Sequence, residues 1–428
     1  MPSKVLWRQF SLTAASSLFL SVVQILVQIY VVAHTTQADY GVFAFTFAIY
    51  SIVESIATGF SADHAMQRLG KNSIQRSIKD QAVNFASLII YDINFYLIVA
   101  GFCTMAGIFM SFLKNFNIYI WLILCFSLVF QIGYSAVKNL LIVYNLIEVQ
   151  TRYEMECVAL ILILSILGTW MSGIEGYALS ISIYQLFKLL LGITKIKSLG
   201  LSWKHIKPHL SLSNYNLNTS ARIAFTAFTR NGLSNLYNQL DILLLGVLTG
   251  NQSFLANYKV AKTLSGLPTK VVYPVWAALR GRMVQAYYAN DFTRLRMLVM
   301  RPLFVFAGLF ILLFLAALIV APYLIPFIYG PEYVGVTQVF LILLVGTLVW
   351  QMSNNWFNFW VIMAGQSRAY IMILIIQIGV LCASLLWMQN IQNTGLFAYW
   401  VTASCITGGA LQFIYFFTFK HKISTSTG

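Results

Sequence analysis

Six ionisable side chains interrupt an apolar stretch between residues 220 and 279 that is long enough for two membrane spans. A charged side chain at the centre of a bilayer costs about 2.5 kcal/mol or more, so such residues face protein or a water-filled cavity. Five of the six are basic, which indicates a cationic lumen suited to phosphate or pyrophosphate groups. The charged residues are Arg222, Arg230, Asp241, Lys259, Lys262 and Lys270.

Helical spacing groups most of these charges. Arg230 and Asp241 are eleven residues apart, close to three helical turns, and therefore share a face of one helix. Lys259 and Lys262 are three apart and share a face of the next helix, which Lys270 continues eleven residues after Lys259. Two interpretations of Asp241 are open: a carboxylate facing the lumen, or a structural ion pair with Arg230 or a lysine.

Polar residues in other spans complete the expected lumen. Glu54 stands alone in the second span and Lys138 lies in the fourth. An alternative for Lys138, and the preferred interpretation for Lys188, is that the aliphatic stem extends to the membrane interface. Asn354 and Asn358 interleave with aromatic residues in the tenth span, a pattern that fits either sugar binding or hydrogen bonding between helices.

The composition predicts an all-α polytopic membrane protein. The 428 residues are 59% hydrophobic and 9% charged, whereas soluble domains carry about 25% charged residues. The apolar runs are about 20 residues long and do not alternate, which favours helices over a barrel. The net charge of +15 would suit nucleic acid, but the basic residues lie mostly in short loops, so no nucleic-acid partner is expected.

Twelve spans are expected, with both termini cytoplasmic. The expected outside loops hold Lys114 alone among lysines and arginines, as the positive-inside rule requires. The spans cover residues 10–33, 41–61, 83–110, 118–145, 155–171, 174–193, 224–248, 254–279, 302–328, 336–364, 370–388 and 395–419.

The two halves of the chain read as a repeat. With a shift of about 215 positions, residues 28–45 lie over residues 241–262, allowing a short insertion. Six spans per half make this repeat parallel, with its axis along the membrane normal and a cavity between the halves. The expected parts are a lobe at 1–194, a basic cytoplasmic linker at 195–218 and a lobe at 219–428. Two prolines, Pro268 and Pro274, should bend the eighth span.

A family resemblance rests on the second half of the chain. It is carried by residues 241–246 (DILLLG), by Tyr258 and Ala261 after a short turn, by Asp291 after the basic loop, and by residues 325–333 (IPFIYGPEY). This pattern resembles Wzx-type polysaccharide flippases, the O-antigen repeat-unit translocases of the multidrug/oligosaccharidyl-lipid/polysaccharide exporter superfamily. The resemblance extends over the whole twelve-span plan.

The resemblance implies a protein of the bacterial inner membrane, in contact with membrane lipids. It would translocate an undecaprenyl-pyrophosphate-linked oligosaccharide by alternating access, beside a polysaccharide polymerase and a chain-length regulator. No bound cofactor is expected. A proton or sodium gradient would drive transport, with Glu54 or Asp241 as the coupling carboxylate.

Three alternatives remain. A multidrug cation exporter of the same superfamily should have an acidic lumen. A major-facilitator transporter for a small anion would use residues 59–63 (GFSAD) and Arg68, where the spacing departs from that family's loop. A sugar polymerase would need a larger outside loop, and the sequence contains no catalytic or metal-binding constellation. The chain is therefore not expected to be an enzyme.

Overall fold

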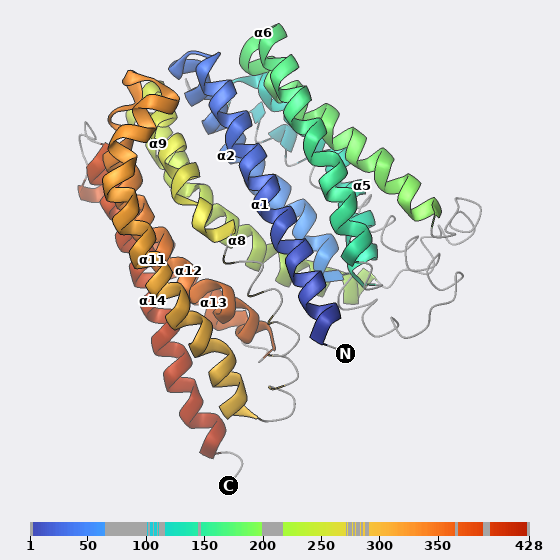
Figure 1. Cartoon of the computed structure of the whole chain (residues 1–428), viewed down its shortest axis with the longest axis vertical. Coiled ribbons are helices and arrows are strands. Elements are labelled where there is room, and N and C mark those ends of the chain that lie inside the picture. The colour runs from blue at the N-terminus through green and yellow to red at the C-terminus, as the bar shows by residue number, and fades with distance from the viewer. Residues whose placement is uncertain are drawn as a thin grey trace. The chain divides into compact units, whose positions relative to one another are not determined.

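The chain is helical throughout the residues that the computed structural model describes (Figure 1). These residues are 3–64, 116–143, 147–198, 217–270, 291–363, 367–387 and 394–425, with single positions between 101 and 110 and between 272 and 286. Within them no residue is in a strand. The expected all-α polytopic fold is confirmed.

The helices follow the expected spans closely. Five of the described helices are long and apolar enough to cross a membrane. The described elements are α1 (Ser3–Ala33), α2 (Gln37–His64), α5 (Ile118–Val143), α6 (Ile147–Ser198), α8 (Leu217–Thr249), α9 (Gln252–Ser265), α11 (Phe292–Tyr329), the 3-10 turn η4 (Pro331–Tyr333), α12 (Val336–Met363), α13 (Ser367–Trp387) and α14 (Thr394–Thr425).

Expected spans and described helices differ at several places, and α1, α8 and α11 begin seven to ten residues before the expected spans at 10, 224 and 302. The spans at 155–171 and 174–193 are the two arms of α6, which turns at Ser172 and at Gly173, where φ is 57°. The span at 83–110 and the linker at 195–218 lie largely outside the described residues. The eighth span is interrupted at Gly266, directly after α9 and two residues before Pro268, while Pro274 lies outside the described residues.

The chain forms two compact units, whose boundaries fall within α1 and α8. One unit is Val22–Gln239. In it α5 packs against α2 and against both arms of α6. The arms of α6 approach so closely at Gly168 and Gly176 that neither position has room for a side chain. The hydroxyls of Tyr50 and Ser127 join α2 to α5 at 2.8 Å.

The other unit combines Met1–Ser21 with Leu240–Gly428. Its central helix is α12, which packs against α9, α11, α13 and α14. Trp356 and Phe357 of α12 are fully buried, and the Trp356 ring meets Phe416 of α14 at 4.8 Å between centroids. This aromatic packing fixes α12 and α14 and gives α9 a rigid neighbour.

Candidate functional site

The α8–α9 hairpin is built by the turn between Thr249 and Asn251. Gly250 has a φ of 57°, a left-handed conformation that glycine adopts without a steric penalty. The Asn251 side chain then caps α9 by accepting a hydrogen bond from the Phe254 N–H at 3.2 Å, which satisfies a donor at the open end of the helix. The hairpin therefore returns the chain alongside α8.

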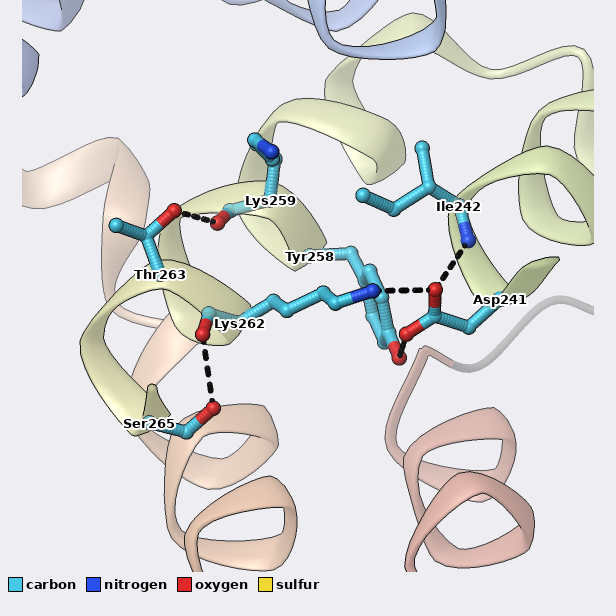
Figure 2. A network of polar contacts seen from close by, with 7 residues as sticks. All are labelled: Asp241, Ile242, Tyr258, Lys259, Lys262, Thr263 and Ser265. Atoms are coloured by element: carbon cyan, nitrogen blue, oxygen red, sulfur yellow. Dashed lines mark hydrogen bonds and ion pairs between the residues drawn. The ribbon is translucent and has the colours of Figure 1, made fainter. Parts of the chain in front are cut away.

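Asp241 is the centre of a polar network inside this hairpin (Figure 2). Its side chain is 4% exposed. The Lys262 Nζ lies 2.6 Å from Oδ1, and the Ile242 N–H donates to the same oxygen at 2.8 Å. The Tyr258 hydroxyl donates to Oδ2 at 2.7 Å. The carboxylate thus has three donors, and one of them carries a positive charge.

This arrangement provides partners for both carboxyl oxygens of Asp241. A buried carboxylate is costly unless it is paired and hydrogen-bonded, and both conditions hold. Of the two interpretations of Asp241, the ion pair with a lysine is present, and its partner is Lys262 on α9. The Tyr258 ring is held edge-on against Phe397 of α14 at 5.7 Å. The Lys262 side chain is 27% exposed, so this side of the pair is accessible.

The remaining basic residues of this region lie in different settings. Lys259 and Lys262 both belong to α9, but Figure 2 shows the Lys262 side chain extended toward Asp241 while Lys259 leaves the helix in another direction. Lys270 is exposed, in the helical segment that follows Gly266. Arg230 belongs to α8, but its side chain lies outside the described residues, as does that of Arg222.

A second charged cluster occupies the unit Val22–Gln239. Lys138 of α5 pairs with Glu154 of α6 at 2.9 Å, and the Tyr134 hydroxyl donates to Glu154 Oε1 at 3.0 Å. Glu54 of α2 is partly buried, and the Gln131 side chain lies within hydrogen-bonding reach of its carboxylate. The cluster brings Lys138 into an ion pair whose carboxylate the sequence did not single out.

Lys188 differs from the expectation that it extends to the membrane interface. Its Nζ lies 3.7 Å from the centroid of the Tyr134 ring and 5.2 Å from that of Tyr184. A cation over an aromatic face is attracted by the ring quadrupole, which holds the ammonium inside the unit. A signal was present in the sequence, because Tyr184 and Lys188 are four residues apart and share a helix face.

The amide residues of the tenth span join helices. The Asn354 Oδ1 accepts hydrogen bonds from the Tyr370 hydroxyl on α13 at 3.3 Å and from Gln412 Nε2 on α14 at 3.4 Å. Of the two roles considered for Asn354, the contact between helices is therefore present. Asn358 belongs to α12, and its side chain lies outside the described residues.

The α1–α2 hairpin contains a neutral counterpart of the Asp241 network. Gln28 Nε2 donates to the Tyr40 hydroxyl at 3.0 Å, and both residues are buried. In the alignment expected from the sequence, residue 28 lies over residue 241, and Tyr40 falls one position from Tyr258. The same kind of side-chain hydrogen bond thus joins the helices of both hairpins.

Comparison with known proteins identifies the fold. The chain matches no protein-family model and no curated protein. It is similar to an inward-facing multidrug resistance MATE family transporter of the MOP superfamily, with 12% identity over 96% of this chain and 95% of that one, at a TM-score of 0.69. The outward-facing conformation of such a transporter gives 13% identity, coverage of 97% and 96%, and a TM-score of 0.67.

A further solved structure with this fold is a MOP superfamily transporter from Pyrococcus furiosus. It shares 13% identity with the chain, covers 95% of this chain and 94% of its own, and gives a TM-score of 0.65. Its structure is described as having a binding pocket of reverse polarity that suggests a different function. The chain thus has the two-lobed, all-helical fold of MATE-type transporters along nearly its whole length.

Proposed function

We propose that this chain is a membrane transporter that moves a molecule with an anionic head group by alternating access. The observation that carries the proposal is the charge of the α8–α9 hairpin and the segment after it. Between residues 241 and 270 the only acidic side chain is Asp241, and Lys262 neutralises it at 2.6 Å. Lys259 and Lys270 then leave the segment with a net positive charge, which favours an anion.

The fold comparisons support the transport part of this proposal. The neighbouring structures are described as MATE and MOP superfamily transporters. One of them is described with a binding pocket of reverse polarity, so the same fold accommodates pockets of different charge. The basic α8–α9 segment of this chain is compatible with that range.

We infer more narrowly that the substrate is an undecaprenyl-pyrophosphate-linked oligosaccharide, as in the Wzx-type flippases that the sequence resembles. A pyrophosphate presents several acceptor oxygens to Lys259, Lys262 and Lys270, and charge-assisted hydrogen bonds of this kind are strong. The protein would work in the bacterial inner membrane, beside a polysaccharide polymerase and a chain-length regulator. A proton or sodium gradient would supply the energy, through Glu54 or Asp241.

Multidrug export is the second candidate, favoured by the descriptions of the neighbouring structures as multidrug resistance transporters. An organic cation would require a carboxylate that is available to it. In the α8–α9 hairpin the carboxylate of Asp241 is already bound to Lys262. A cation would have to displace this lysine, which makes the anionic substrate the better match.

Transport by the purified protein in liposomes separates the two candidates. One set of vesicles contains a fluorescent polyprenyl-pyrophosphate glycolipid, whose arrival in the outer leaflet is measured by membrane-impermeant quenching. A second set measures uptake of ethidium, an organic cation. We expect movement of the glycolipid and no uptake of ethidium under a proton or sodium gradient.

A matched control is the double variant with Lys259→Gln and Lys262→Gln, assayed beside Lys197→Gln, which changes an exposed lysine at the end of α6. The double variant should lose glycolipid movement while Lys197→Gln retains it. Ethidium uptake without glycolipid movement would instead establish the multidrug candidate.

A further inference from the structure

The outer face of α11 carries one continuous line of exposed side chains. At 100° per residue, Arg294, Arg301, Val305, Leu312 and Ile319 all lie within about 20° of one line along the helix. The apolar members are strongly exposed, with Val305 at 69%, Leu312 at 66% and Ile319 at 70%. Both arginines are also exposed. An exposed apolar stripe on a membrane-spanning helix faces lipid, and here it continues into two positive charges.

The depth of these residues matches the layers of a bilayer. From Val305 to the exposed Tyr323 the helix rises about 27 Å, close to the hydrocarbon thickness of about 30 Å. Arg301 lies about 6 Å below Val305, within a headgroup layer of about 5–8 Å on each side. Arg294 lies about 10 Å further out, where its charge still acts across roughly one Debye length.

One exposed position beside the stripe carries no side chain. Gly308 is exposed, lies about 40° from Leu312 around the helix, and a side chain added there would meet nothing within 4 Å. Among the described residues, neither Arg301 nor Arg294 forms an ion pair, and the nearby Asp291 carboxylate caps the helix by accepting from the Arg294 backbone N–H at 2.9 Å.

We propose that Arg301 binds the phosphate of an anionic phospholipid whose acyl chain lies along Val305 and Leu312, and that Arg294 adds a longer-range attraction for the same headgroup. The guanidinium group presents several donors to a phosphate, and a basic side chain near the surface of an anionic membrane contributes measurably to lipid attraction. This site lies on the outer face of the helix and is independent of the proposed substrate.

Native mass spectrometry of the full-length protein, titrated with phosphatidylglycerol or phosphatidylcholine in mild detergent, tests the proposal. We expect phosphatidylglycerol to remain bound at lower lipid concentration than phosphatidylcholine. The variant Arg301→Gln should weaken phosphatidylglycerol binding about fivefold, and adding Arg294→Gln should weaken it further. The matched control is Arg296→Gln, because Arg296 is exposed on the same helix but lies about 160° from Arg294.

A second variant tests the acyl-chain part of the site. Gly308→Leu adds a bulky side chain beside the stripe and should weaken retention of phosphatidylglycerol while both arginines remain. Inorganic phosphate alone should not displace the lipid, because it cannot occupy the apolar stripe. Three results would each overturn the proposal: equal loss in Arg296→Gln, equal binding of phosphatidylcholine, or full competition by inorganic phosphate, which would indicate a site for free phosphate.

Discussion

In each of the α1–α2 and α8–α9 hairpins a side-chain hydrogen bond joins the two helices. The partners are neutral in the first hairpin and include a charged residue in the second. In the first, Gln28 donates to the Tyr40 hydroxyl at 3.0 Å. In the second, the Tyr258 hydroxyl donates to Asp241 at 2.7 Å, and Lys262 adds the opposite charge. The first hairpin is thus joined by a hydrogen bond between neutral side chains, whereas the second adds an ion pair, and the contribution of that ion pair can be measured.

The two hairpins also differ in length by about one turn on each arm. Gln28 lies five residues before the end of α1 and Tyr40 three after the start of α2. Asp241 lies eight residues before the end of α8 and Tyr258 six after the start of α9. The hydrogen bond therefore lies three residues further from the turn on each arm of the second hairpin.

The largest expected effect comes from Lys262→Ala. This change leaves the Asp241 carboxylate buried without its positive partner, and breaking a buried pair in this way costs about 3 kcal/mol. The hydrogen bonds that Tyr258 and the Ile242 N–H still donate to Asp241 keep this cost near the lower end of the values known for broken buried ion pairs. Reversible unfolding in detergent–micelle mixtures measures it. A free energy of unfolding equal to that of the unchanged protein would mean that the ion pair does not contribute to stability.

Removal of the two tyrosine hydroxyls should have unequal effects. Tyr258→Phe removes a bond to a charged acceptor and should cost about 2 kcal/mol, whereas Tyr40→Phe removes a neutral bond and should cost about 1 kcal/mol. Both changes preserve the ring and its packing, so each variant is the control for the other in the same unfolding assay. Equal losses would show that the charge of Asp241 does not strengthen its hairpin.

Copying the neutral hairpin into the charged one should restore stability without restoring transport. The position four residues after Tyr40 is Ala44, just as Lys262 follows Tyr258. The variant with Asp241→Gln and Lys262→Ala should therefore unfold within about 1 kcal/mol of the unchanged protein, because replacing both members of a buried pair is often neutral. Glycolipid movement in liposomes should be lost. Glycolipid movement that persists in this variant would mean that the Asp241–Lys262 pair contributes to stability and not to transport.

The sequence was most informative where physical constraints are local. Apolar run length placed the helices, whereas the hydrogen bonds between Gln28 and Tyr40 and between Tyr258 and Asp241 were not predicted. The partners of individual charges were harder to predict, because they depend on the facing helix. Spacing put Lys259 and Lys262 on one face, yet only the return angle of the hairpin directs Lys262 to Asp241. Lys188 likewise required knowledge that Tyr134 lies opposite.

The smallest effect on stability is expected at Lys270. Under a shift of about 215 positions Lys270 lies over Ser55, beside Glu54, and Lys270→Ile removes the positive charge at this position. Because Lys270 is exposed, the change should alter stability by no more than about 0.5 kcal/mol.

If Lys270 contacts the pyrophosphate, loss of a charged hydrogen bond should slow glycolipid movement about tenfold. Lys197→Ile, at an exposed position on α6, controls for the loss of a surface charge. Equal rates of glycolipid movement in the two variants would show that Lys270 does not contact the pyrophosphate. The basic residues that act in transport would then be those of α9, where the two hairpins differ.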